Sequence, residues 1–281
     1  MPWISALAQS SPALKSLPRL ALVVGNGSYR HLDILKNAPN DASAVGARLR
    51  SMGFEVMLEV DVSKAAFETA IERFCARLGN CVGLFYFAGH GMQVSWRNYL
   101  VPIDAKLNDI EDVSTRSVDL VTFMEALRKA RNPMNIIILD ACRNNPFAAE
   151  GKVPKGLSQM DAPVGTFLAY ATAPGNSASD GAGSNGLYTE HLLNELGRKD
   201  AKIEDVFKRV RLNVRLASKG EQVPWESTSL EEDFYFSPGA ESRAATRTER
   251  DRRFEEDLRA WQETEAKVAA AFRVLSPGPQ R

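Results

Sequence analysis

The sequence is poor in the residues that build metal centres and disulfide scaffolds. Its 281 residues include three cysteines and three histidines, with neither a C-x-x-C pair nor a Cys/His cluster. An odd number of cysteines cannot pair completely, so the sequence disfavours both a disulfide scaffold and a structural zinc site. Cysteine usage of this kind fits a reducing compartment best, and we expect a cytoplasmic protein.

A surplus of one charge and a long apolar run are also missing. Lys+Arg and Asp+Glu both number 35, so no global field favours a nucleic-acid partner. No stretch reaches the roughly 18 consecutive apolar residues of a transmembrane helix, which argues against a membrane span. The first residues carry a small-x-small motif, Ala6-Leu7-Ala8, without a basic region before it. We expect a flexible N-terminal arm here; the alternative is the remnant of an export signal in a periplasmic protein.

The composition is that of a globular protein, with 44% hydrophobic and 25% charged residues. Short apolar runs alternate with amphipathic stretches of helical periodicity, a pattern that predicts an α/β fold with a mostly parallel sheet covered on both faces. The predicted strands are 20–25, 54–60, 82–88, 135–139 and 165–172, with a small hairpin of 92–94 and 99–103. The predicted helices are one capped by Asn40, then 63–78 capped by Ser63, 118–130, 187–196 and 203–216.

The composition changes near residue 240, where a charged segment without Gly or Pro begins. Its apolar residues follow 4-3 spacing over residues 254–275, which predicts a helix that self-associates as a coiled coil. A single amphipathic helix is an equally open interpretation. We therefore expect a flexible arm over residues 1–18, one α/β domain over 19–238 and a C-terminal helical extension over 239–281.

Two predicted strands end in reactive side chains. His90 follows strand 82–88 between two glycines, and Cys142 follows strand 135–139. Functional groups of parallel sheets gather at the carboxyl ends of the strands, so the two side chains meet if their strands are neighbours. A cysteine beside a histidine is the minimum for a thiol nucleophile, and the amides of Gly91 and Cys142 could hold a developing oxyanion. Taken singly, a buried Cys or a lone His is more often structural, and we expect that role for Cys75, Cys81, His31 and His191.

The order and spacing of the motifs resemble a known family. His90 precedes Cys142 by about 50 residues, as in caspases. The similar segments are LALVVGNGSY, LKNAPNDASAV, GLFYFAGHGMQ, NYLVPIDA, IIILDACRNNPF and FLAYATAPGNSASD. Over about residues 19–236 the chain resembles caspase-like (clan CD) cysteine peptidases, particularly paracaspases and bacterial orthocaspases. This resemblance implies a three-layer α/β/α sandwich. The caspase string Q-A-C-[RQG]-G is not met, so cleavage after Asp is not expected.

The resemblance also implies an acidic S1 pocket, the pocket that receives the side chain before the scissile bond. The matching acids are Asp41, Asp140 and Asp180. The stretch Gln222-Val223-Pro224-Trp225 resembles the one that supplies a substrate-facing strand in the family, so Trp225 could form the wall of a subsite. Other interpretations stay open for each of them. Asp140 could be bound by backbone amides of the neighbouring turn, and Asp41 could serve the helix dipole. Asp180 lies in a Gly/Ser/Asn loop, and Trp225 could be a packing residue.

These observations predict a cysteine endopeptidase that cleaves proteins and peptides after Arg or Lys, with no cofactor. No metal site is assigned, and a dependence on Ca²⁺ stays open. The loop 143–163 contains Lys152 and Lys155, where relatives are often processed, so autoprocessing there is a further hypothesis. The main alternative is a non-catalytic caspase-like module that assembles through its C-terminal helix. Nucleotide binding is disfavoured, because Gly25-Asn26-Gly27 lacks the G-x-G-x-x-G spacing.

Overall fold

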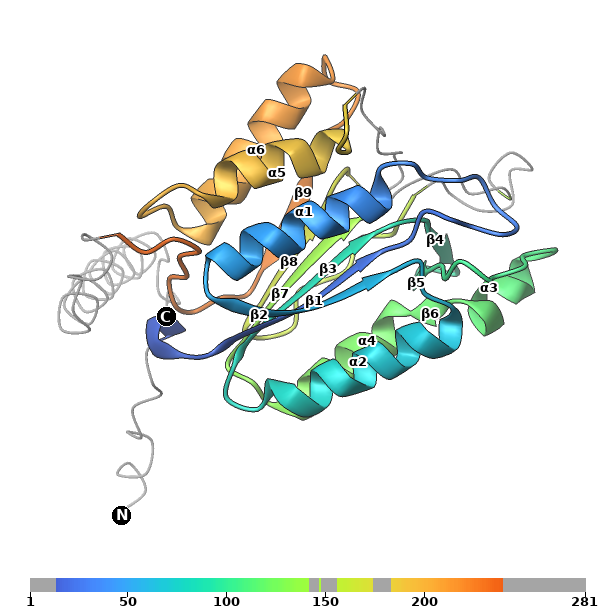
Figure 1. Ribbon diagram of the computed structural model, residues 1–281, viewed down its shortest axis with the longest axis horizontal. Helices are drawn as coiled ribbons and strands as arrows, with labels where there is room; N and C mark the ends of the chain where they lie inside the picture. Colours follow the sequence, from blue (N-terminus) through green and yellow to red (C-terminus); the bar gives the residue numbers. More distant parts are fainter. Residues whose placement is uncertain (1–13, 142–146, 148–155, 174–182, 240–281) are drawn as a thin grey trace, which may run out of the picture. The chain divides into compact units, whose positions relative to one another are not determined.

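A six-stranded sheet in the order β2-β1-β3-β7-β8-β9 forms the centre of the fold (Figure 1). The computed structural model describes residues 14–141, 147, 156–173 and 183–239. The strands are β1 (Arg19–Gly25), β2 (Phe54–Val60), β3 (Val82–Ala88), β7 (Met134–Asp140), β8 (Thr166–Tyr170) and β9 (Trp225–Thr228). All neighbours pair in parallel except β9, which runs antiparallel to β8. The central strands β3, β7 and β8 are buried along their whole length and mostly apolar, because helices cover both of their faces.

Helices pack on both faces of this sheet and make it the middle of three layers (Figure 1). One face carries α1 (Ala38–Ser51), α5 (Leu187–Leu196) and α6 (Ile203–Ala217), and the other carries α2 (Lys64–Leu78) and α4 (Leu120–Ala130). A short helix, α3 (Ile110–Arg116), and a small antiparallel sheet of β4 (Gly91–Val94), β5 (Arg97–Leu100) and β6 (Val118–Asp119) complete the domain. The predicted α/β/α sandwich is confirmed.

Local signals located some helix starts and missed others. Ser63 caps α2 as predicted, its hydroxyl accepting the Ala66 N–H at 3.4 Å. The prediction that Asn40 caps α1 was wrong, because the helix already begins at Ala38 and the fixed φ of Pro39 suits its first turn. Residues 118 and 119 were predicted to be helical, but they pair with β5 as strand β6, and only then does α4 begin.

The ends of the chain are described in part. Leu14–Ser16 form a 3₁₀ turn, and Leu14 and Leu17 are buried in the core, so the last residues of the predicted arm pack on the domain. Residues 1–13 and 240–281, including the predicted helix 254–275, lie outside the described residues. Among the helices of the described part, none is both long and apolar enough to cross a membrane.

Candidate active site

The two strands that lead to His90 and Cys142 lie side by side. β3 and β7 pair in parallel with Ala88 opposite Asp140, and Gly89 donates its N–H to the Asp140 carbonyl at 3.3 Å. His90 follows Ala88 by two residues, and Cys142 follows Asp140 by two residues. The condition set by the sequence analysis, that these two strands be neighbours, is therefore met. Cys142 itself lies outside the described residues.

Gly91 packs closely against the residue that precedes Cys142. A methyl group added at Gly91 would lie 3.0 Å from the Ala141 carbonyl oxygen and 3.0 Å from Cδ2 of Leu157. Both neighbours are completely buried, so neither can easily retreat. The absence of a side chain at residue 91 therefore lets β4 begin directly against the end of β7. The oxyanion hole expected from the amides of Gly91 and Cys142 remains a prediction.

His90 is buried, with 3% of its surface exposed, and its imidazole has a defined hydrogen-bond partner. The Nε2 atom lies 2.8 Å from the backbone carbonyl oxygen of Asp33. A carbonyl oxygen can only accept, so Nε2 carries the proton in this contact. In the neutral ring the basic lone pair is then on Nδ1. This is the protonation state in which a histidine can remove a proton from a thiol.

Two predicted acids converge on the first turn of α5. Asp41, in the first turn of α1, and Asp140, at the end of β7, are both buried. The Gly186 N–H donates to Oδ1 of Asp41 at 2.9 Å, and the Thr189 hydroxyl donates to Oδ2 of Asp140 at 2.8 Å. The structure thus joins two residues that are far apart in the sequence into one acidic cluster beside the strand ends.

Two tyrosines next to this cluster were missed by the sequence analysis. Thr189 uses its proton on Asp140, so its oxygen accepts the hydroxyl of Tyr86 at 2.6 Å. Burial raises the pKa of Tyr86 well above its usual value, and the charges of Asp140 and Asp41 raise it further. Burial and the charge of Asp140 likewise raise the pKa of Tyr188. The one available signal was a hydroxyl-bearing residue inside the apolar strand VGLFYFA.

Two further predicted site residues, Asp180 and Trp225, were implied by the resemblance. Asp180 falls outside the described residues. Trp225 begins the edge strand β9 opposite Tyr170, and 44% of its surface is exposed, so a role as a subsite wall remains a prediction. Within the described ranges, no three His, Cys, Asp or Glu side chains gather as a metal-binding group.

The two cysteines expected to be structural are both free thiols. Burial raises the pKa of Cys75 to about 11, which leaves little thiolate at neutral pH. Cys81 donates its S–H to the Arg77 carbonyl at 3.8 Å. Neither environment favours a nucleophile.

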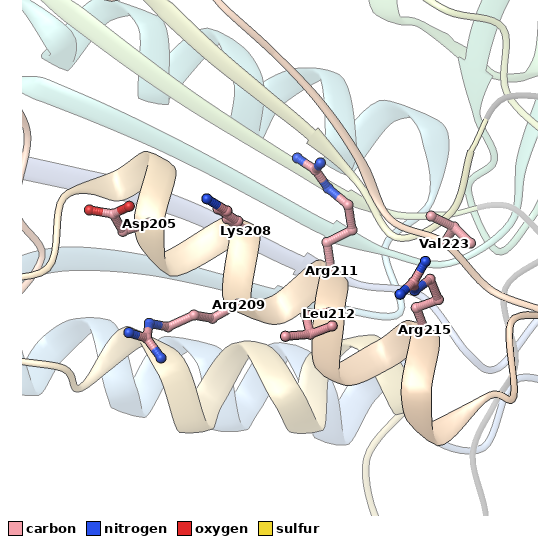
Figure 2. Close-up of a pocket in the computed structure, with 7 residues that line it drawn as sticks. All are labelled: Asp205, Lys208, Arg209, Arg211, Leu212, Arg215 and Val223. Atoms are coloured by element: carbon pink, nitrogen blue, oxygen red, sulfur yellow. The ribbon is translucent and has the colours of Figure 1, made fainter.

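A separate groove of about 480 Å³ runs along α6 (Figure 2). Most of its lining is basic, and Arg211 forms an ion pair with Glu226 of β9. The lining residues are Asp205, Lys208, Arg209, Arg211, Leu212, Arg215 and Val223. Because neither His90 nor the two buried acids contribute to it, the groove is not part of the candidate active site.

Comparisons with known proteins agree with this geometry. The sequence profile of the caspase domain matches residues 18–235. Human mucosa-associated lymphoid tissue lymphoma translocation protein 1 is 27% identical over 192 residues, which are 66% of this chain and 22% of the human protein. A probable protease from a Desulfuromonadales bacterium is 30% identical over 135 residues, 42% of this chain and 16% of that protein. The chain thus spans about a fifth of the length of the curated relatives that it matches.

Proposed function

The chain belongs to the caspase domain family of peptidases, and on that basis we propose that it is a cysteine endopeptidase that cleaves after Arg or Lys. The observation that carries this proposal is the register of β3 and β7. Ala88 pairs with Asp140, and His90 and Cys142 each follow one member of that pair by two residues. A histidine and a cysteine delivered to the same edge by adjacent parallel strands are suited to share a proton.

In the proposed reaction, Nδ1 of His90 removes the proton from the Cys142 thiol. The thiolate sulfur attacks the scissile carbonyl carbon, and the amides of Gly91 and Cys142 donate to the oxyanion. The C–N bond then breaks, and His90 returns the proton to the leaving amine. Water, deprotonated by His90, hydrolyses the resulting thioester and restores the thiol.

Specificity for a basic residue is proposed from the acidic cluster. Asp41 and Asp140 are buried carboxylates, and a buried charge is costly unless hydrogen bonds or a cation stabilise it. Thr189 and Gly186 supply hydrogen bonds, and the guanidinium or ammonium group of a substrate would supply the cation. The resemblance to paracaspases adds Asp180 to this pocket and Trp225 to its surroundings.

Matched fluorogenic peptides that differ only in Arg, Lys or Asp before the scissile bond test the proposal. We expect turnover of the Arg and Lys peptides by the wild type, none of the Asp peptide, and none of any peptide by Cys142→Ala or His90→Ala. The control is Cys81→Ala, which removes another thiol and should keep wild-type activity. Equal activity of Cys142→Ala and wild type would end the proposal.

The alternative, a non-catalytic assembly module, makes a different prediction for a thiol-reactive peptide that carries Arg at P1, the position that the S1 pocket receives. The peptidase should be labelled at Cys142, and excess Arg substrate should slow the labelling. A protein that is neither labelled nor active, and whose self-association depends on residues 254–275, would instead be an assembly module.

A further inference from the structure

The loop between β1 and α1 carries a tyrosine that holds the backbone of His90. Tyr29 is buried, and its hydroxyl accepts the His90 N–H at 2.7 Å. The same hydroxyl donates to the Val101 carbonyl at 3.2 Å, while the Val101 N–H donates to the His90 carbonyl at 3.0 Å. The peptide groups on both sides of the His90 Cα atom are therefore fixed, one by Tyr29 and one by Val101.

The same loop also fixes the imidazole. The ring centroids of Tyr29 and His90 are 4.4 Å apart, so the two rings are in contact. Asp33, four residues after Tyr29, provides the carbonyl oxygen that lies 2.8 Å from Nε2 of His90. One segment thus controls the backbone position of the histidine, the orientation of its ring and the nitrogen that carries its proton.

A carboxylate at the end of β2 holds the beginning of this loop. Asp61 accepts the N–H groups of Gly27 and Ser28, each at 2.8 Å, and the Ser28 hydroxyl at 2.6 Å. Its own N–H donates to the Gly25 carbonyl at 2.9 Å. Three donors on one carboxylate make a strong anchor, because hydrogen bonds to an ionised acceptor are stronger than neutral ones.

We propose that Tyr29 and Asp61 are positioning residues for His90. Asp61 fixes the start of the loop, Tyr29 fixes the backbone of His90, and the Asp33 carbonyl selects the imidazole tautomer with its basic lone pair on Nδ1. This inference rests on the proposed role of His90 as acid and base. It adds that the backbone of His90 is held by the hydroxyl of a residue 61 positions away in the sequence.

Tyr29→Phe is the first test, because it removes one hydroxyl and keeps the ring. We expect kcat for an Arg peptide to fall about tenfold, KM to change little, and the apparent pKa of the acidic limb of kcat/KM to shift. Tyr235→Phe is the matched control. It removes a hydroxyl that contacts Asp233 outside the site and should leave kcat and the pH profile unchanged.

Asp61 is tested with two variants, because its φ of 52° disfavours most side chains. Asp61→Gly removes the carboxylate without backbone strain, and we expect it to reproduce the loss of kcat and the shifted pH profile of Tyr29→Phe. Asp61→Asn keeps one acceptor oxygen and tolerates this φ, so it should retain more activity than Asp61→Gly. Equal kcat and equal pH profiles for wild type and Asp61→Gly would remove Asp61 from the proposal.

The ¹⁵N spectrum of the imidazoles separates this inference from the proposed function. The chain has three histidines, so the signals of His90 can be assigned with His31→Gln and His191→Gln. We expect wild type to show the Nε2–H tautomer and Tyr29→Phe to show a tautomer mixture. An unchanged spectrum and pH profile in Tyr29→Phe would overturn the positioning role. Absence of Cys142-dependent turnover in wild type would instead overturn the proposed function. The spectrum would then still decide whether Tyr29 positions His90.

Discussion

At the scale of single residues, the carboxylate of Asp140 shows how burial and function are balanced. It accepts the Thr189 hydroxyl, and its charge adds to the effect of burial in raising the pKa of Tyr86 and of Tyr188. An ionised carboxylate at this buried place is costly unless a partner stabilises it. On the proposed specificity, the cationic side chain of a substrate would reduce this cost.

Asp140→Asn tests this balance, because the amide oxygen can still accept the Thr189 hydroxyl while the charge is lost. We expect kcat/KM for Arg and Lys peptides to fall by about two orders of magnitude, since a charge-assisted pair is removed. The free energy of unfolding should stay within about 1 kcal/mol of wild type. Peptide kinetics and urea denaturation measure the two effects. A large loss of stability with unchanged kcat/KM would mean that Asp140 is structural.

Thiol labelling tests the assignment of the cysteines. Burial raises the pKa of Cys75 to about 11, and only the thiolate reacts with iodoacetamide. In Cys142→Ala, we therefore expect Cys75 to stay unmodified at neutral pH and to become reactive only as the pH approaches its pKa. Mass spectrometry of the labelled peptides reports this. Rapid modification of Cys75 at pH 7 would contradict the buried environment.

The carboxylate of Asp61 predicts a pH dependence of stability. Burial would raise its pKa, but hydrogen bonds from the Ser28 hydroxyl and from the amides of Ser28 and Gly27 together outweigh burial, and the pKa is lowered. Because the carboxyl group has a lower pKa in the folded state, it stabilises the fold at pH values above its unfolded pKa of about 3.9. This contribution to the free energy of unfolding is lost as the pH falls through the folded-state pKa. We expect wild type to lose its advantage over Asp61→Asn in urea denaturation as the pH falls below about 4, the unfolded value. Parallel curves for the two proteins would contradict this.

At the scale of elements, the hairpin of β4 and β5 connects the two halves of the site. It begins at Gly91, directly after His90, and the side chain of Asn98 on β5 binds the backbone of Ser158. The Asn98 amide donates to the Ser158 carbonyl at 2.8 Å and its oxygen accepts the Ser158 N–H at 2.7 Å. Ser158, which follows Cys142 in the chain, is thus hydrogen-bonded to the hairpin that follows His90.

Gly91→Ala tests this connection, since the new methyl group would press on Ala141 and Leu157. We expect the fold to persist and kcat/KM to fall more than tenfold, because β4 must move away from the end of β7. Gly183→Ala is the matched control, as nothing lies within 4 Å of its added methyl group. Circular dichroism and peptide kinetics distinguish a local displacement from unfolding. Full activity of Gly91→Ala would show that the close contact is not required.

The same elements show what could be predicted from the sequence. The bounds of β3 followed from a continuous apolar run ended by Gly89, and those of α5 from its periodicity after a Gly-rich loop. Predictions failed where pairing with a distant strand decides the secondary structure. Residues 118 and 119 form β6 only because β5 lies beside them. In the site, position at a strand end indicated His90, and the family resemblance indicated Asp140. Tyr29 and Thr189 were missed, because no local sequence pattern marks them. Tyr29 binds His90, 61 positions away, and Thr189 binds Asp140, 49 positions away.

At the scale of the whole molecule, the N-terminal residues extend the domain beyond the strand that opens the sheet. Leu14 and Leu17 are buried, although the sequence analysis assigned both to a flexible arm. Burial of a leucine side chain contributes about 1.5–3 kcal/mol to stability. The domain is therefore expected to need its residues from about 14 onwards.

Two shortened chains that both end at residue 238 test this expectation. A chain beginning at residue 19 should be less stable by about 3–6 kcal/mol than one beginning at residue 14, since it lacks both buried leucines. Urea denaturation of the two chains measures the difference. A chain carrying Leu14→Ser and Leu17→Ser should match the shorter one; equal stability of all three would show that the arm contributes nothing.

The fastening of Ser158 to Asn98 has a consequence for any cut at Lys152 or Lys155. The piece before the cut contains β1, β2, β3 and β7, and the piece after it contains β8 and β9 of the same sheet. Leu157 is completely buried in the core. The new amino terminus, a few residues before Leu157, would therefore remain attached to the domain. A nicked molecule should therefore migrate as one species on a native gel and as two bands only after denaturation.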